Sequence, residues 1–498
     1  MKKYILFVLI IGLVAFSCTL KNPTQPDIKG VTQGDLALTK MVAIGNSLTA
    51  GFQSAGLVEE YQLTSYPYQI AKQMGVADDF QQPLIADPGI SSTPGVGVLD
   101  FNPATGAIEP RGTYTNPMAL LKNALLPRPY DNLGVPGADL NDALNTVNGS
   151  GGNPFFDLIL RNPNFGNTTM WQQAKLLKPT MVLLWIGNND VLGAALDGGD
   201  MNQITPAQDF QNMFVELLTD VASIRPAGQL AIFMANIPNV TDIPYVNILD
   251  NFIYRDITIP GVGPVSLPVV FDQNFQPVDF DTSAGELYLP LLTSENLLTV
   301  GSPVKHILLP FLSEYQSSGL GVPDSAAIVP LLVAAGVPLG QAMIQAHALE
   351  QAMQANGLIT SGDSIPGNLT LTEAEETTIS GAVTGFNQII GGIAQSQGIP
   401  LVDINALLNE INMTGVDGFT GKFVLIDPVN TAFSLDGVHA NNGGYALVAN
   451  KFIEKINQVL GSSIPLVNTA QYKGQYTGMN PTTISLEAAK QAKAIFTR

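Results

Sequence analysis

The segment Met41–Ser47, with the sequence MVAIGNS, decides how this chain folds. Its first four residues are apolar and a glycine follows them, which is typical of a strand whose two faces are both buried. Similar apolar runs occur at Thr180–Ile186, Leu230–Met234 and Leu401–Ile404. Buried strands of this kind predict a parallel sheet in the interior of the protein.

Helical patterns separate these strands along the chain. One pattern covers Gln208–Ile224, and another covers Gly443–Leu460. The capping-box sequence TEAE at Thr372–Glu375 opens a further helix that runs towards Gln397. Strands that alternate with helices predict an α/β fold whose parallel sheet is covered on both faces. Sites in such sheets lie at the carboxyl ends of the strands, so we expect each functional motif to follow a strand.

Composition and charge exclude several classes of function. The chain has 498 residues, of which 46% are hydrophobic and 13% are charged, so it can bury a core and is not disordered throughout. Its 22 basic and 41 acidic residues give a formal net charge of −19, which disfavours nucleic acid and anionic lipid as partners. Cys18 is the only cysteine, so an intramolecular disulfide and a cysteine-built zinc site are excluded. We expect no metal and no organic cofactor.

The N-terminus has the pattern of an export signal. Two lysines precede the apolar run Ile5–Phe16, which is too short to span a bilayer comfortably. The small residues Ala15 and Ser17 lie just before Cys18, and this arrangement resembles a bacterial lipobox, in which the cysteine is lipidated. We therefore expect residues 1–17 to be a lipoprotein signal peptide and residues 18–39 to be a tether. The alternative is an ordinary secretory signal that happens to contain a cysteine.

Residues 246–365 break the alternation of strands and helices. This stretch is rich in Pro, Leu, Val and Gly, and the sequence predicts a helical part from about Asp324 to Asn356. It reads as an apolar insertion that forms either a lid or wall of a substrate cleft or a structural subdomain with its own core. His306 and His347 lie within it, and we expect structural or surface roles for both.

Two motifs at opposite ends of the chain carry residues suited to nucleophilic catalysis. Ser47 directly follows the first strand, at a strand-to-helix turn where a hydroxyl is exposed above a sheet. Serine is also a common helix N-cap, so this signal alone is weak. Asp436 stands three residues before His439, a spacing that lets a carboxylate orient an imidazole as general base.

Two further turns offer hydrogen-bond donors. Gly137 ends the sequence NLGVPG (residues 132–137) and presents a backbone N–H, whereas Asn189 in GNND (residues 187–190) presents a side-chain amide. Two such donors aimed at one point would form an oxyanion hole for acyl transfer. Both sequences are also those of ordinary turns.

Taken together, these four blocks resemble the SGNH (GDSL-type) serine hydrolase family. The blocks are G-N-S-L, N-x-G-x-x-G, G-x-N-D and D-x-x-H, in the order in which the family has them. The resemblance implies a three-layer α/β/α sandwich of the flavodoxin-like type with a central parallel sheet and a large insertion. It divides the hydrolase core into residues 40–245 and 366–466, and it leaves residues 467–498 as a C-terminal extension. The segment from Gly51 to Pro67 also looks like lipoprotein members from Bacteroidetes-type bacteria.

The resemblance also implies a role for each matched residue. Ser47 is the nucleophile, His439 is the base and Asp436 orients His439. The oxyanion hole comprises the N–H of Ser47, the N–H of Gly137 and the side chain of Asn189. The chain departs from the family at Asn46, where an aspartate is usual.

The expected function is that of an extracytoplasmic, lipid-anchored serine esterase or lipase-like hydrolase. It would act on carboxylic esters, either lipid-like or on acylated glycans, through an acyl-enzyme on Ser47. We expect it in the cell envelope, held at a membrane through lipidated Cys18, with the outer membrane favoured. The alternatives are a polysaccharide O-acetyl esterase and a non-catalytic binding lipoprotein that keeps the fold. A further alternative is a transporter-associated or envelope structural protein whose function resides in the insertion.

Overall fold

The computed structural model describes residues 33–102, 104, 107–162, 164–259, 263–272, 275–282, 285–294 and 304–476. The expected signal peptide, Cys18, residues 19–32 of the expected tether and residues 477–498 of the C-terminal extension lie outside the described residues. Within the described ranges, no helix is long and apolar enough to cross a membrane.

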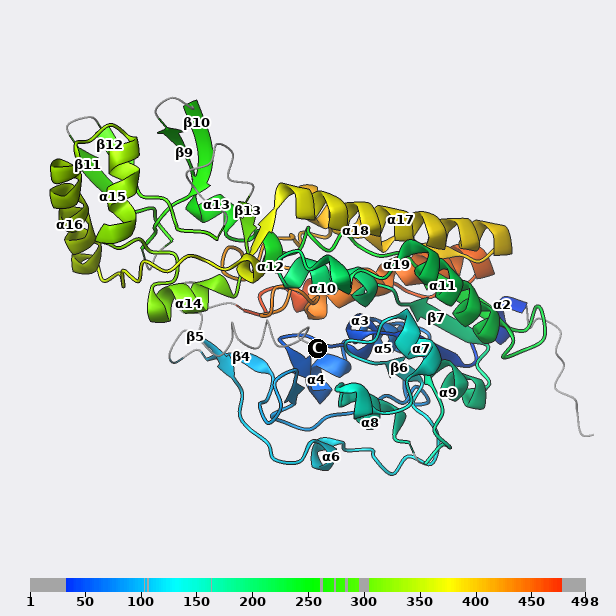
Figure 1. Cartoon of the computed structure of the whole chain (residues 1–498). Coiled ribbons are helices and arrows are strands. Elements are labelled where there is room, and N and C mark those ends of the chain that lie inside the picture. Colours follow the sequence, from blue (N-terminus) through cyan, green and yellow to red (C-terminus); the bar gives the residue numbers. More distant parts are fainter. Residues whose placement is uncertain are drawn as a thin grey trace, which may run out of the picture.

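Five parallel strands form the central sheet (Figure 1). Their order across the sheet is β15 (Leu401–Val402), β8 (Ala231–Ala235), β7 (Met181–Trp185), β1 (Met41–Gly45) and β6 (Asn132–Gly134). Every residue of β1 and β7 is buried, which explains why their sequences are apolar without alternation. The predicted α/β fold with a central parallel sheet is therefore confirmed.

The two edge strands of this sheet, β6 and β15, differ from the prediction. The strand β6 has the sequence NLG, which sequence analysis treats as a turn, yet it pairs in parallel with β1. The expected strand Leu401–Ile404 ends at Val402 instead, because the Asp403 side chain accepts a hydrogen bond from the Ala406 N–H and caps the helix α18 (Ile404–Met413).

Alternate residues of β1 contribute to two separate apolar clusters. Val42 and Ile44 belong to a cluster with the helices α7 (Leu140–Asn145) and α11 (Ala207–Ala222). Met41 and Ala43 belong to another cluster with α5 (Tyr66–Gln73) and α19 (Asn442–Leu460). Helices therefore cover the strand from two sides, as the period of two along a strand requires.

The predicted capping box opens the long helix α17 (Glu373–Gln397). The Thr372 hydroxyl accepts a hydrogen bond from the Glu375 N–H, and the Glu375 carboxylate accepts one from the Thr372 N–H. The helix ends at Gly398, whose φ of 64° lies in the left-handed region that glycine adopts without strain. The start and the end of this helix are thus both set by local sequence.

The expected insertion forms an arm that extends from the central sheet (Figure 1). It carries two antiparallel hairpins, β9–β10 (Tyr254–Ile259, Gly263–Pro268) and β11–β12 (Asp279–Thr282, Gly285–Tyr288). The predicted helical part forms two helices, α15 (Ser325–Ala334) and α16 (Leu339–Ala355), with α14 (Phe311–Ser318) before them.

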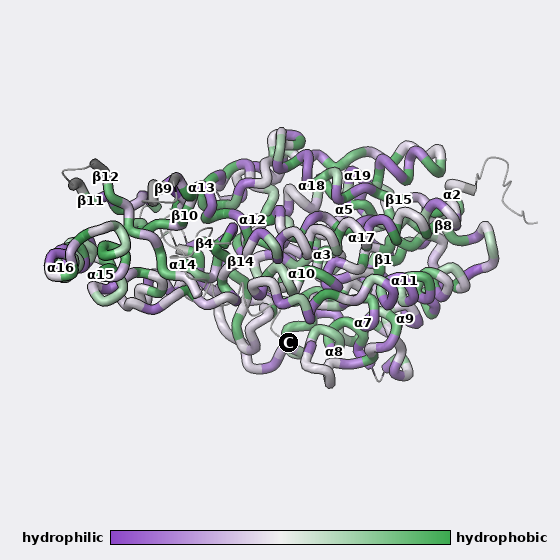
Figure 2. Tube along the Cα trace, turned by 45° about the horizontal axis from the view of Figure 1, so that its top comes forward, coloured by the Kyte–Doolittle hydropathy of each residue, from purple (hydrophilic) through white to green (hydrophobic). Residues whose placement is uncertain are grey.

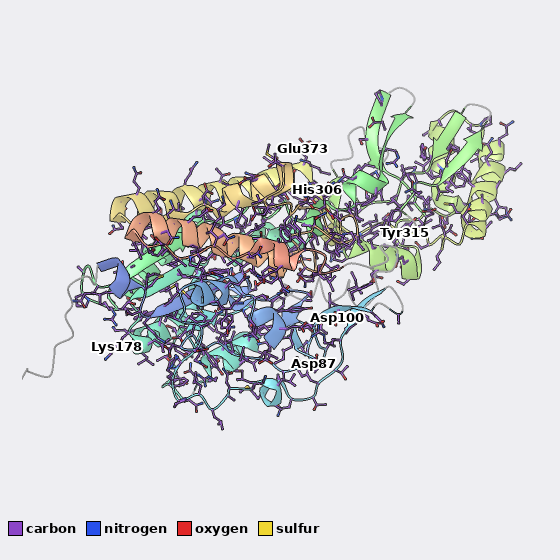
Figure 3. The ribbon with its side chains drawn as sticks, turned by 180° about the vertical axis from the view of Figure 1, so that it is seen from behind. Asp87, Asp100, Lys178, His306, Tyr315 and Glu373 are labelled. Atoms are coloured by element: carbon purple, nitrogen blue, oxygen red, sulfur yellow. The ribbon has the colours of Figure 1, made fainter. Side chains whose placement is uncertain are left out.

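The chain returns from the arm to the core through β14 (Thr370–Thr372), which pairs with β13 (Val304–Ile307) and directly precedes α17. Helix α13 (Asp250–Ile253) lies beside this junction, and Figure 3 shows His306 and Glu373 there, where the arm meets the core.

The remaining elements are short or flank the sheet. They are α2 (Gln33–Ala37), α3 (Ser47–Ala50), β2 (Gly56–Leu57), α4 (Glu59–Gln62), β3 (Ile90–Ser91), β4 (Leu99–Asn102), β5 (Ala107–Pro110), α6 (Pro117–Leu120), α8 (Phe155–Leu160), α9 (Met170–Leu177), α10 (Asn189–Leu196) and α12 (Pro244–Asn247).

Candidate active site

A sharp turn at the end of β1 places Ser47 on the first turn of a helix. The strand ends at Gly45 and α3 begins at Ser47, with Asn46 between them as N-cap. A side chain at Gly45 would collide with the Thr49 side chain and the Trp185 carbonyl, so only glycine fits. The turn therefore presents Ser47 at the carboxyl end of β1, as predicted.

Asn46, the departure from the family pattern, uses both ends of its amide. Its Oδ1 accepts a hydrogen bond from the Leu48 N–H at 3.1 Å and its Nδ2 donates to Asn188 Oδ1 at 3.2 Å. An aspartate could accept the first bond but could not donate the second. Asn46 thus links the Ser47 turn to the loop that follows β7.

Ser47, His439 and Asp436 form a continuous chain of hydrogen bonds. The Ser47 Oγ lies 2.9 Å from His439 Nε2, and His439 Nδ1 lies 3.0 Å from Asp436 Oδ2. Ser47 is 3% exposed, His439 1% and Asp436 0%. The fold thus brings together a hydroxyl and an imidazole that are 392 residues apart, in the geometry of a nucleophile, its base and the carboxylate that orients the base.

Asp436 is held as a carboxylate. Its Oδ1 accepts hydrogen bonds from the Ser434 hydroxyl at 3.0 Å and from the Val438 and His439 N–H groups, each at 2.9 Å. Its Oδ2 accepts from the Ala55 N–H at 2.9 Å as well as facing His439. Burial alone would raise the pKa of Asp436, but the charge of His439 and these hydrogen bonds hold that pKa below its ordinary value. An ionised Asp436 can stabilise an imidazolium on His439.

A strained turn supports this carboxylate, and sequence analysis did not find it. Ser54 and Ala55 adopt φ angles of 53° and 62°, a left-handed conformation that costs a non-glycine residue about 1–2 kcal/mol. The Ala55 N–H donates to Asp436 directly, and the Ser54 N–H donates at 2.9 Å to the Ser434 hydroxyl, which itself donates to Asp436. The sequence carries no signal for it, because neither residue is one that favours such a turn.

An aromatic ring, that of Phe52, packs against the His439 imidazole. The Phe52 ring lies 4.7 Å from the His439 ring between centroids, and the two planes are tilted by 50°. The Phe52 carbonyl in turn accepts a hydrogen bond from the Tyr445 hydroxyl at 2.6 Å. His439 is therefore held between a buried aromatic ring and a carboxylate.

The two other predicted donors, Gly137 and Asn189, lie on connected turns. Gly137 has a φ of 78° in the loop after β6, where Asn153 Nδ2 donates to the Pro136 carbonyl at 2.7 Å. Asn189 is the first residue of α10, after β7, and its Nδ2 donates to the Ala138 carbonyl at 2.8 Å. One hydrogen bond thus ties the loop of Gly137 to the side chain of Asn189.

Asp190 reinforces the same connection. Its carboxylate accepts hydrogen bonds from the Leu140 N–H at 3.1 Å and from the Thr205 hydroxyl at 2.8 Å. Burial, together with the charge of Asp139, raises the pKa of Asp190 to about 7. Sequence analysis quotes this residue in the third block and assigns it no role, whereas the structure places it as the link between α7 and α10.

One sequence expectation about position is wrong. Ser47, Gly137 and Asn189 each follow a strand of the central sheet, but Asp436 and His439 do not. They lie in the irregular connection between α18 and α19, within the described range 304–476. The imidazole reaches the sheet edge because this connection folds back on itself, with the Ser434 N–H donating to the His439 carbonyl at 2.8 Å.

The two histidines of the arm have different surroundings. His306 is 5% exposed, and its Nδ1 lies 2.6 Å from Asp250 Oδ2, so it is a buried residue and not a surface one. His347 has a side chain that is 67% exposed, on α16. Among the described residues, no group of three or more His, Cys, Asp or Glu side chains is placed to hold a metal ion.

Comparison of the chain with protein-family models, with curated protein sequences and with solved structures gives no match.

Proposed function

We propose that this chain is a serine ester hydrolase with an SGNH-type site. The observation that carries the proposal is the hydrogen-bonded chain from Ser47 through His439 to Asp436. The order of the four sequence blocks supports it, and so do the helix clusters on two sides of β1, which fit a three-layer α/β/α arrangement. The envelope location and lipidated Cys18 belong to the same proposal and are supported by the N-terminal sequence alone.

The geometry suits a two-step reaction. Ser47 Oγ attacks the ester carbonyl carbon while His439 Nε2 takes the hydroxyl proton, and Asp436 stabilises the resulting imidazolium. The oxyanion accepts hydrogen bonds from the N–H groups of Ser47 and Gly137 and from Asn189, whose amide has a second N–H besides the one given to Ala138. His439 then protonates the leaving alcohol. In the second step, water attacks the acyl-enzyme with His439 as base, and this step releases the acid.

Two ester classes fit the proposal, and chain length separates them. An apolar insertion favours lipid-like esters with long acyl chains, whereas an envelope enzyme could equally remove acetyl groups from polysaccharide. The site needs only the carboxylic ester bond in either case, so the choice lies in what surrounds the site.

The test is hydrolysis of p-nitrophenyl esters from acetyl to palmitoyl by residues 19–498, which include every described residue. We expect Ser47→Ala to lower the rate by about 10³-fold or more, because the acyl-enzyme can no longer form. The matched control is Ser318→Ala, since Ser318 is exposed on α14 and its hydroxyl bonds only within that helix in the described structure. A fluorophosphonate probe should label Ser47, and the labelled peptide is identified by mass spectrometry.

Equal rates for the wild type and Ser47→Ala on every ester, with no labelling of Ser47, would contradict the proposal. That result would favour a non-catalytic binding protein. An optimum at acetyl esters would identify a deacetylase, and an optimum at long chains would identify a lipid esterase.

A further inference from the structure

The arm ends in a helical hairpin that carries no charge over a long stretch. Helix α15 and most of helix α16, both labelled in Figure 2, lie between Asp324 and Glu350, and residues 325–349 contain no Asp, Glu, Lys or Arg. Figure 1 shows the two helices at the end of the arm, away from the central sheet. We call residues 333–344 the hairpin tip; they comprise the end of α15, the turn between the helices and the start of α16.

The hairpin tip exposes large apolar side chains. Leu339 is 61% exposed, Met343 is 58% exposed, Ile344 is 73% exposed and Val333 is 43% exposed. Leu339 and Met343 are four residues apart and share one face of α16, while Ile344 is about 100° further round the helix. The small residues between the helices, at positions 334–336, are exposed as well. On α16 the exposed residues Gln341 and Gln345 lie beside these apolar side chains and are uncharged. The exposed apolar surface therefore covers the end of α15, the turn between the helices and one broad side of α16.

Low charge alone does not explain this exposure. Residues 377–402, which include most of α17, also contain no charged residue. There the large apolar side chains are buried or partly buried, and the buried ones include Ile379, Val383, Phe386 and Ile390. None of the exposed large hydrophobic residues of the described structure lies in that stretch. The large apolar side chains of the hairpin that are fully buried, Ile328 and Met353, both lie outside the tip. The large apolar side chains of the tip therefore face solvent.

The distribution of the exposed side chains identifies the kind of partner. A protein groove takes up one face of a helix, and the matching helix has an apolar stripe with polar flanks. Here the exposed apolar surface also includes Val333 at the end of α15 and the turn between the helices, and an apolar medium can accommodate this whole end of the hairpin. We propose that the hairpin tip inserts into the surface of a lipid bilayer, at the boundary between headgroups and acyl chains.

Charge restricts the kind of lipid. Residues 325–355 contain no Lys or Arg to bind an anionic headgroup, and the chain as a whole has a formal net charge of −19. Binding therefore depends on apolar burial, favours uncharged headgroups and changes little with salt. Anionic lipid weakens it by repulsion.

The test is flotation of residues 19–498 with vesicles of phosphatidylcholine, and with vesicles that also contain phosphatidylglycerol, at two salt concentrations. We expect binding to phosphatidylcholine vesicles at both concentrations and weaker binding to the anionic vesicles. The double substitution Met343→Asp with Ile344→Asp should lower the bound fraction about ten-fold or more, because carboxylates are costly in the membrane interface. The matched control is Leu176→Asp with Met413→Asp, at positions 54% and 82% exposed on other helices, and it should bind as the wild type does.

A second measurement places the tip itself. In Ile344→Trp, the new indole should shift its emission to shorter wavelength when phosphatidylcholine vesicles are added. No flotation of the wild type, or equal flotation of the tip variant and the control, would overturn the proposal. A dimer that only the tip substitutions dissociate, without vesicle binding, would show that a second copy occupies the surface. None of these readouts uses ester hydrolysis, so their failure leaves the proposed enzyme activity standing.

Discussion

Two buried histidines of this chain, His439 in the core and His306 where the arm joins it, differ in one partner. Each has an aspartate at Nδ1, with Asp436 at 3.0 Å and Asp250 at 2.6 Å. At Nε2, however, His439 faces the Ser47 hydroxyl at 2.9 Å, whereas His306 faces a Glu376 oxygen at 3.5 Å. An Asp–His pair is thus not in itself a catalytic signature, and the group at the second ring nitrogen decides what the pair can do.

The two aspartates also differ. Asp436 accepts four hydrogen bonds besides that of the imidazole, and its pKa lies below the ordinary value. Asp250 has one buried oxygen without a hydrogen-bond partner among the described residues, and burial raises its pKa. The core pair is built to hold a carboxylate beside a base. The arm pair belongs to a cluster of charges, with Glu376 bonded to Lys305, that fastens β13 to α17.

The largest difference is expected from the same substitution made at both histidines. His439→Gln should lower the rate of ester hydrolysis by about 10⁴-fold or more, because no base remains at Ser47. His306→Gln should leave that rate unchanged but should reduce the free energy of unfolding by about 1.5–3 kcal/mol, because the bond to Asp250 loses its charge. Rates with p-nitrophenyl esters and urea unfolding curves measure the two effects.

Equal losses of activity in the two variants would contradict the separation of a catalytic pair from a structural pair. A large loss of stability in His439→Gln would show that the core pair also holds the fold together. Substitution of exposed His347, His347→Gln, serves as the control and should change neither quantity.

The sequence predicts the centre of the molecule better than its edges. Strands such as β1 and β7 are found because all of their residues are apolar and buried. The edge strand β6 is missed because Asn and Gly are poor strand formers, and its place depends on pairing with β1. The β-hairpins of the arm are missed as well, since its Pro-rich apolar sequence has no clear period.

The site shows the same limit. The sequence identifies Ser47, Asp436 and His439 because each lies in a short motif whose residue types indicate a chemical role. The fold brings the three residues together. The left-handed turn at Ser54–Ala55 is imposed by contacts with Asp436 and Ser434, which lie about 380 residues away. Local sequence cannot predict a conformation that distant contacts create.

A smaller loss of activity is expected at Asn189, the proposed oxyanion donor. Asn189→Ala removes a side chain tied to the Gly137 loop, and it should lower kcat by about 10²–10³-fold, or about 2.7–4 kcal/mol, with little change in KM. The matched control is Asn387→Ala, because Asn387 lies on α17 and, among the described residues, its amide bonds only to the Ile237 backbone. That variant should lose stability and keep its kcat. A rise in KM with kcat unchanged in Asn189→Ala would instead assign Asn189 to substrate binding.

The smallest effect that we expect is a pH dependence of the free energy of unfolding, which comes from the arm pair, His306 and Asp250. Burial alone would lower the pKa of His306, but the hydrogen bond and charge of Asp250, with Glu376, raise it above its ordinary value of 6.5. Folding therefore favours the protonated ring, so its stabilising contribution is complete below pH 6.5 and disappears as pH rises through the raised pKa. Lys305 and Asp242 also face this cluster. Both residues are present in the wild type and in His306→Gln, so a comparison of these two proteins isolates the contribution of His306.

Between about pH 6 and pH 9, wild-type protein should lose more unfolding free energy than His306→Gln, because deprotonation of the ring removes the charge from its bond to Asp250. Urea unfolding across this range measures the difference, with His347→Gln as a control that should follow the wild type. If the unfolding free energies of wild type and His306→Gln change equally with pH, the imidazolium charge contributes nothing to the attachment of the arm. The junction would then depend on the β13–β14 pairing and on the bond from Lys305 to Glu376, neither of which needs a histidine.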